Sequence, residues 1–185
     1  MIIGISGLAR SGKDSFFEYS KPYLDSISKK YTRLAFADAL KQETDEFLKT
    51  NIGISSFTEK NSEKEIIRPF LVTYGTHIRR KLNQNCWIDK IQDSVIKESQ
   101  SGKVVFITDV RFENEIDWVH EIGGKSLHIK RLNNIAPNEE ELKNDPILRS
   151  KSNFHIEWKD FCEYQDGNIL NLVSERIQSI LNEKV

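Results

Sequence analysis

Short runs of apolar residues alternate along the chain with longer amphipathic stretches. The run Val-Val-Phe-Ile at 104–107 is apolar at every position, which is typical of a strand that helices cover on both faces. Strands that alternate with helical stretches predict an α/β fold with a parallel sheet. The expected strands are Ile2–Ser6, Thr32–Phe36, Val104–Thr108, Ser126–Ile129 and Phe161–Tyr164.

Two of the expected helices carry apolar residues at a spacing close to the period of an α-helix. The last one follows the turn-like residues 165–167, and its apolar stripe comprises Ile169, Leu172, Val173, Ile177, Ile180 and Leu181. Another is expected to begin near Pro69, because the fixed φ of proline suits the first turn of a helix. Its stripe would comprise Phe70, Leu71, Tyr74, Ile78 and Leu82.

Two polar stretches interrupt this pattern. Residues 51–65 contain Gly53, paired serines and mixed charges, and residues 132–153 contain the run Asn-Asn-Ile-Ala-Pro-Asn-Glu-Glu-Glu. Stretches of this composition form either plain surface loops or flaps that fold over a site. Composition alone leaves both interpretations open.

Composition narrows the class of protein. The 185 residues include 27 lysines and arginines against 28 aspartates and glutamates, whereas a dedicated nucleic-acid binder usually has a clear basic excess. Two cysteines, Cys86 and Cys162, make neither a disulfide framework nor a zinc site, which favours a reducing cytoplasm. No apolar run reaches the roughly 20 residues that span a bilayer. We therefore expect a cytoplasmic protein, monomeric or homodimeric, that binds no nucleic acid or membrane.

The strongest motif is the segment 7–15, Gly-Leu-Ala-Arg-Ser-Gly-Lys-Asp-Ser, between the first strand and a helix. Its G-x-x-x-x-G-K spacing is that of a phosphate-binding loop, or P-loop. Such a loop directs backbone N–H groups and the positive end of a helix at a polyphosphate, and Lys13 would bridge the β- and γ-phosphates. The expected nucleotide-binding residues are Gly7, Arg10, Ser11, Gly12, Lys13, Asp14 and Ser15.

Asp14 stands directly after the lysine, where serine or threonine usually binds Mg²⁺. Ser15, one residue later, is expected to contact a phosphate. Asp14 itself would either bind Mg²⁺, directly or through water, or stabilise the first helical turn through the helix dipole. We prefer the helix-dipole interpretation.

Charged residues follow the other predicted strands. Asp109 ends an apolar strand, where an aspartate commonly organises Mg²⁺ beside a phosphate loop, although it could also cap the next helix. Arg111 lies two residues further, and Arg68, Arg80 and Arg131 also lie at predicted element ends. Guanidinium groups suit bidentate phosphate binding, so these arginines are candidates for the transferred and acceptor phosphates.

The histidines show no metal-ligand spacing with the cysteines or with one another. The histidines His77, His120 and His128 are expected at the surface or partly buried. Trp87, Trp118 and Trp158 are expected to anchor the core or an interface.

Several segments together resemble the phage-type deoxynucleoside monophosphate kinases. The most specific pair is the phosphate loop ending in GKDS with DVRFENE at 109–115. Three further segments match the family less specifically: FADALK at 36–41, RPFLVTYGTHIRR at 68–80 and GGKSLHIKR at 123–131. The resemblance covers nearly the whole chain.

The resemblance implies a three-layer α/β P-loop kinase fold in one domain, residues 1–185, with about five parallel strands flanked by helices. Residues 37–100 would be the helical insertion that binds the monophosphate, and residues 132–153 a short lid-like flap. The reaction would be transfer of the γ-phosphoryl group of ATP, with Mg²⁺, to a deoxynucleoside monophosphate. The implied catalytic residues are Lys13, Arg68, Arg80, Arg111 and Arg131. The implied substrate-binding residues are Asp38, Lys41, Arg68, Thr76, Arg80, Asp109 and Arg111.

Two other functions fit the same loop. A kinase with a hydroxyl acceptor, such as dephospho-coenzyme A kinase or a nucleoside kinase, needs a general base, and Asp38 is placed to be one. A monophosphate acceptor is already ionised near neutral pH and needs no base. The alternative of another class is a nucleotide-binding switch without turnover, although such proteins usually carry serine or threonine directly after the lysine.

Overall fold

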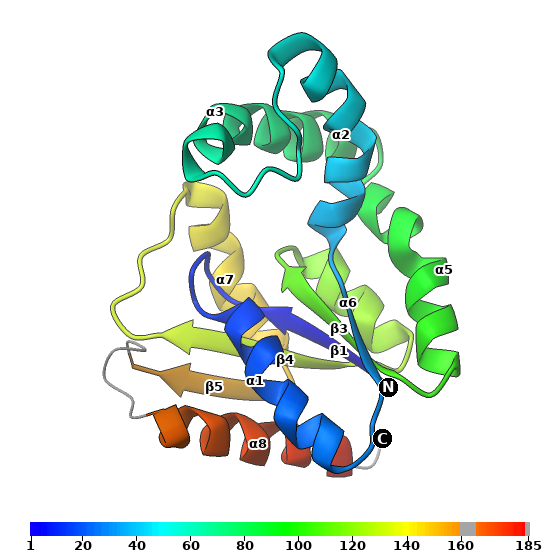
Figure 1. Ribbon diagram of the computed structural model, residues 1–185, viewed down its shortest axis with the longest axis vertical. Helices are drawn as coiled ribbons and strands as arrows, with labels where there is room; N and C mark the ends of the chain where they lie inside the picture. The colour runs from blue at the N-terminus through cyan, green and yellow to red at the C-terminus, as the bar shows by residue number, and fades with distance from the viewer. Residues whose placement is uncertain (160–165, 184–185) are drawn as a thin grey trace. The chain divides into compact units, whose positions relative to one another are not determined.

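Helical segments separate the strands along the chain, as the hydrophobic pattern predicts, and a run of several helices lies between the second and third strands (Figure 1). The computed structural model describes residues 1–159 and 166–183. The strands in this part are β1 Ile2–Ser6, β2 Tyr31–Leu34, β3 Val104–Val110, β4 Lys125–Arg131 and β5 Phe154–Trp158. The helices are α1 Lys13–Ser26, α2 Phe36–Ile52, α3 Asn61–Val72, the π-helix η1 Thr73–Arg79, α4 Arg80–Leu82, α5 Cys86–Gln100, α6 Glu113–Glu121, α7 Glu139–Lys151 and α8 Asp166–Asn182.

The chain divides into two compact units. The sheet unit, residues 1–34 and 94–185, contains all the strands above together with α1, α6, α7 and α8. The helical unit, residues 35–93, contains α2, α3, η1 and α4, and helix α5 begins in it and ends in the sheet unit. The phosphate loop, residues 7–12, therefore belongs to the sheet unit.

The five strands form one parallel sheet in the order β2-β3-β1-β4-β5. β1 is the central strand, paired with β3 on one side and with β4 on the other. In parallel sheets, ligands bind beyond the carboxyl ends of the strands. The loop that follows β1 lies at that edge, between the ends of β3 and β4.

Side chains of β1 alternate between two covered faces, because successive residues of a strand point in opposite directions. Ile3 and Ile5 belong to the core that β1 shares with α1 and α8. On the other face, a Cβ added to Gly4 would lie 3.1 Å from Val119 of α6. Helices thus cover both faces, and the predicted three-layer α/β architecture is confirmed.

Four of the five predicted strands are confirmed within two residues at either end, but the fifth differs. β5 is Phe154–Trp158, whereas the predicted strand Phe161–Tyr164 lies outside the described residues. β5 has buried residues at 154, 156 and 158 and exposed residues between them. Its apolar positions alternate with a histidine and a glutamate, so it lacks the continuous apolar run that marked the other strands.

Most of the polar stretch 132–153 is helical. Helix α7 begins after Asn138, whose side chain accepts a hydrogen bond from Glu141 N at 2.8 Å. Leu148 is its buried hydrophobic residue, so the helix lacks the apolar stripe that identifies a helix in a sequence. The stretch 51–65 contains the end of α2, a connecting loop and the start of α3.

The helix predicted to begin near Pro69 begins eight residues earlier, at Asn61, and Pro69 lies inside it. The predicted apolar stripe fails at its far end, because Ile78 and Leu82 are 47% and 78% exposed, whereas Phe70, Leu71 and Tyr74 are half-buried. The π-helix η1 follows α3 directly. Its wider turn rotates every later side chain relative to an α-helical register, so the assumed spacing does not hold beyond Thr73.

One carboxylate in the helical unit contacts side chains from two other helices. Glu43 of α2 accepts a hydrogen bond from the Tyr74 hydroxyl at 2.7 Å and pairs with Arg79 Nε at 2.8 Å and Lys90 Nζ at 3.1 Å. Burial acts to raise the pKa of Glu43, but the hydrogen bonds from Tyr74 and Lys90 and the Arg79 charge hold it below its usual value. The ionised carboxylate therefore ties α2 to η1 and α5.

The last helix matches its prediction. In α8, Ile169, Val173, Ile177 and Ile180 are buried, and Leu172 and Leu181 pack against the same core. No helix in the described ranges combines the length and apolar character that a membrane span requires.

Candidate functional site

The loop between β1 and α1 depends on two glycines. Gly7 has φ = 132°, and a Cβ there would collide with the carbonyl oxygen of Ile129 on β4. Gly12 has φ = 94° and precedes the first residue of α1. Residues other than glycine rarely adopt these backbone angles. The two glycines of the motif therefore stand where the loop bends.

The loop presents hydrogen-bond donors that have no acceptor. The first N–H groups of α1 lack intrahelical partners, as at the start of any helix. Ser11 is 1% exposed, and within the described residues its hydroxyl makes no hydrogen bond. Buried polar groups in folded proteins are nearly always hydrogen-bonded. A polar ligand in the loop would satisfy both sets of groups.

Lys13 lies over the start of the loop. Its Nζ donates to the carbonyl oxygens of Gly7 and Leu8, each at 2.8 Å, and the residue is 9% exposed. These two carbonyls are neutral acceptors, so the hydrogen bonds bring no negative charge to the ammonium group. An anion entering the loop would provide a counter-charge.

Five charged residues act on one another around this loop. Burial lowers the pKa of Lys13 to about 8 and the Arg111 charge acts in the same direction, while Glu141, Asp109 and Asp14 act to raise it. The structure thus brings the predicted residues Lys13, Asp14, Asp109 and Arg111 into electrostatic range and adds Glu141.

A β-bulge positions Asp109. Gly4 and Ser6 of β1 pair with Ile107 and Val110 of β3, so β3 has one extra residue in this interval. Bulges bend a strand and redirect side chains, often next to active sites. The half-buried Asp109 lies in the bulge, where its charge acts on the buried lysine.

Glu115 fixes the turn that carries Arg111. Glu115 is 2% exposed, and its Oε2 accepts hydrogen bonds from Arg111 N at 2.8 Å and Phe112 N at 3.1 Å. The Arg111 side chain is 47% exposed. The buried glutamate therefore positions the backbone of the turn and leaves the guanidinium available to the loop.

A carboxylate from α7 contacts both the loop and this arginine. Glu141 Oε2 accepts a hydrogen bond from Ala9 N at 2.7 Å, and Glu141 Oε1 accepts one from Arg111 Nη1 at 2.7 Å. A phosphate oxygen requires the same two donors, a backbone amide and a guanidinium. An anionic ligand that uses these donors has to displace Glu141.

One more side chain from the predicted flap, and the arginine directly before the flap, also contact the loop. Asn134 Nδ2 donates to Ala9 O at 2.9 Å, and Arg131 Nη1 donates to Arg10 O at 3.3 Å. Together with Glu141 they join residues 131–141 to the loop. The structure therefore places Arg131 at the loop, as the sequence predicts for a residue at the start of the flap.

Asp14 lies in the first turn of α1 and pairs with Arg33 Nε at 3.3 Å. This position and partner agree with the preferred helix-dipole interpretation. Among residues 1–159 and 166–183, no three histidine, cysteine, aspartate or glutamate side chains gather as a metal site. Ser15 is half-buried in the same helical turn.

The remaining candidates belong to the helical unit. They lie in α2, α3, η1 and α4 and are Asp38, Lys41, Arg68, Thr76 and Arg80. Arg80 is 8% exposed, and Arg68 is exposed. The predicted site residues therefore fall into two groups. The phosphate loop, Asp109, Arg111 and Arg131 lie in the sheet unit, and the candidates named in this paragraph lie in the helical unit.

Sequence reasoning missed two residues at the loop and misplaced one nearby. Glu141 lies in an acidic run that is also typical of a solvated helix start, and Trp158 was expected only as a core or interface anchor. His128 was expected at or near the surface, but it is 1% exposed and contacts Asp145 Oδ1 at 3.0 Å. It lies in β4, which helices cover on both faces.

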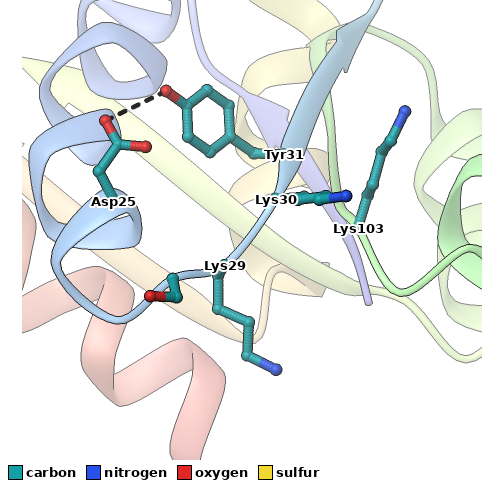
Figure 2. A pocket seen from close by; sticks show the side chains of 6 residues that line it. Asp25, Lys29, Lys30, Tyr31 and Lys103 are labelled. Atoms are coloured by element: carbon teal, nitrogen blue, oxygen red, sulfur yellow. Dashed lines mark hydrogen bonds between the residues drawn. The ribbon is translucent and has the colours of Figure 1, made fainter.

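A separate surface pocket lies at the amino ends of β2 and β3 (Figure 2). Its lining includes Lys29, Lys30 and Lys103, and Tyr31 donates a hydrogen bond to Asp25 Oδ2 at 3.4 Å. The phosphate loop follows the carboxyl end of β1, so this pocket is at the other edge of the sheet. It shares no lining residue with the candidate site.

The sequence is similar to a family model and to a curated viral protein. A family model described as Phosphomevalonate kinase matches residues 5–125. The uncharacterized protein ORF77 of Ictalurid herpesvirus 1 (strain Auburn) is 29% identical over 129 residues, which are 69% of this chain and 53% of that protein. The chain thus spans about half the length of this curated relative.

Two solved structures have the same fold. Dephospho-CoA kinase from Campylobacter jejuni is 18% identical with a TM-score of 0.51, over 97% of this chain and 95% of that chain. TT1252 from Thermus thermophilus is 14% identical with a TM-score of 0.50, over 99% of this chain and 98% of that chain. The first of these is a kinase by name, and the likeness establishes a shared fold.

Binding of a nucleoside triphosphate should become weaker as the pH rises through about 8, where the pKa of Lys13 lies. The polyphosphate needs the protonated amine, so binding above this pH should take up a proton. Calorimetry at pH 8.5 in buffers of different ionisation enthalpy measures that uptake. Lys13→Met should abolish it, and equal uptake by this variant would assign the proton to another group.

Glu141→Gln should bind inorganic tripolyphosphate about ten times more tightly than the unmodified protein, because the anion no longer has to displace a charged competitor. Isothermal titration calorimetry measures the affinity. Glu139→Gln is the matched control, since it removes the same charge from an exposed position of the same helix. If both variants gained the same affinity for tripolyphosphate, the effect of Glu141→Gln would be explained by the general change in surface charge.

Proposed function

The chain belongs to the phosphomevalonate kinase family, and we propose that it transfers the γ-phosphoryl group of ATP to the phosphate of a deoxynucleoside monophosphate. The observation that carries this proposal is the Glu141 carboxylate, which the Ala9 amide and the Arg111 guanidinium hold beside the phosphate loop. A carboxylate bound in this way marks a position suited to a phosphate.

The loop supplies the groups that a triphosphate donor requires. The unbonded Ser11 hydroxyl, the N–H groups at the start of α1 and the buried Lys13 amine all fit an anion with several oxygens. In this proposal Gly7, Arg10 and Gly12 shape the loop around the phosphates.

The residues at the loop also fit Mg²⁺. This ion keeps most of its water and binds phosphates with one or two carboxylates, so it does not need a cluster of three acidic side chains. Asp109 would hold it, with Asp14 contributing directly or through water. When bound, Mg²⁺ neutralises charge that develops on the phosphate oxygens.

A phosphate acceptor agrees with the arginines at the site. Arg111 and Arg131 bring two permanent positive charges to the loop, and transfer between two phosphates requires neutralisation of oxygens on both. The acceptor named by the family, a phosphorylated mevalonate, also carries a phosphate. Within the helical unit we assign acceptor binding to Asp38, Lys41, Arg68, Thr76 and Arg80.

A hydroxyl acceptor such as dephospho-coenzyme A is the second candidate. The likeness to dephospho-CoA kinase over 97% of this chain favours it, although a likeness at 18% identity concerns the fold. This reaction requires removal of a proton from the attacking hydroxyl. Asp38 would then act as the general base.

The first test is release of ADP from ATP and Mg²⁺ with a panel of acceptors. The panel contains deoxynucleoside monophosphates, ribonucleoside monophosphates, phosphomevalonate and dephospho-coenzyme A, and we expect turnover with a deoxynucleoside monophosphate. Lys13→Ala should lower kcat about 1,000-fold, because it removes a charge that stabilises the transferred group. Turnover restricted to dephospho-coenzyme A, or unchanged turnover in Lys13→Ala, would contradict the proposal.

Asp38→Asn separates the two candidate acceptors. With a monophosphate acceptor, turnover should stay within about tenfold of the unmodified protein, because the acceptor is already ionised. With a hydroxyl acceptor it should fall about 100- to 10,000-fold, the usual contribution of a general base. Steady-state kinetics measures both, and Glu46→Gln, an exposed change on the same helix, is the control.

A further inference from the structure

A tryptophan from β5 holds the phosphate loop from within the core. Trp158 Nε1 donates a hydrogen bond to the carbonyl oxygen of Ser11 at 2.7 Å, across 147 positions of sequence. Both residues are 1% exposed. The Trp158 ring also packs against Phe16 of α1, with ring centroids 6.5 Å apart. The contact is thus buried and fixed on both sides.

This hydrogen bond determines where the next amide points. The carbonyl of Ser11 and the N–H of Gly12 belong to one planar trans peptide unit and point in opposite directions. Because the indole holds the carbonyl, the Gly12 N–H is directed away from Trp158. Within the described residues this N–H makes no hydrogen bond of its own, so it is available to a ligand.

Backbone hydrogen bonds hold the peptide units on either side, from Ser11 N to Leu8 O at 3.1 Å and from Phe16 N to Gly12 O at 2.9 Å, whereas the indole holds the unit between Ser11 and Gly12. Gly12 precedes α1 without a side-chain cap, and glycine adopts both signs of φ at small cost. If the unit turned over, the Ser11 carbonyl oxygen would point to the ligand side and repel phosphate oxygens. Preventing this rotation is a function that a buried indole donor can perform.

We propose that Trp158 is a positioning residue for the phosphates of the donor, acting through the Gly12 amide. The inference rests on the proposed binding of a triphosphate in this loop. The same residue also anchors the flap, since its carbonyl oxygen accepts a hydrogen bond from Leu132 N at 3.0 Å. Trp158 therefore contacts both the phosphate loop and the first residue of the flap.

Trp158→Phe tests the inference, because it keeps an aromatic ring and removes the N–H donor. We expect about a tenfold weaker affinity for inorganic tripolyphosphate by calorimetry and an increase in the KM for ATP, with an unchanged KM for the acceptor. Trp118→Phe is the matched control, since Trp118 is a buried tryptophan of α6 in the same unit. The control should retain the affinity of the unmodified protein.

A measurement on the unmodified protein does not depend on the stability of the variant. In ¹⁵N-tryptophan-labelled protein, the Trp158 indole signal should shift when tripolyphosphate is added, because the ligand binds the amide of the same peptide unit. Retained affinity in Trp158→Phe, or an unmoved Trp158 signal at saturation, would overturn this inference alone. Failure of the unmodified protein to bind tripolyphosphate would overturn the proposed function together with it.

Discussion

The structure depends on the phosphate loop, residues 7–12, which gathers hydrogen-bond donors next to the positive charges of Lys13 and Arg111. The buried Lys13 donates hydrogen bonds to two neutral carbonyl oxygens, and the Arg111 charge acts on it from nearby. Like charges brought together in a partly desolvated site destabilise a fold unless an anion offsets them. Glu141 brings such an anion from α7, and its carboxylate occupies the two donors that we propose for a phosphate.

The sheet explains how such a loop keeps its shape. β1 is bonded on both sides, and the loop that follows is fixed by contacts from three directions: Ile129 of β4 excludes a side chain at Gly7, Trp158 of β5 holds Ser11, and the first turn of α1 begins at Lys13. A site built on rigid elements keeps its donors oriented before the ligand arrives, which lowers the cost of binding. The bulge in β3 affects Asp109 in a related way, because the extra residue shifts the pairing with β1 and bulges redirect side chains.

Features that depend on local sequence could be predicted, and features that depend on distant contacts could not. The loop and β1 follow from glycine spacing and a short apolar run, and the last helix follows from its apolar period. Glu141 and Trp158 contact the loop across 132 and 147 positions of sequence, and nothing near either residue marks that contact. The apolar stripe predicted after Pro69 failed at its far end for a different reason, since the π-helix η1 changes the register on which that stripe relied.

The division into two units bears on how one fold can serve different acceptors. The groups that we assign to the phosphate donor all lie in the sheet unit. The residues that we assign to the acceptor within 35–93 lie in the helical unit, which has its own cluster of polar contacts around Glu43. Phosphate binding by a loop of main-chain amides tolerates few changes, because its bends require glycine and its donors must converge. Side chains on helices can change without disturbing that loop. Selection between a nucleoside monophosphate and another acceptor is therefore expected to depend on the helical unit, while the sheet unit sets the donor chemistry.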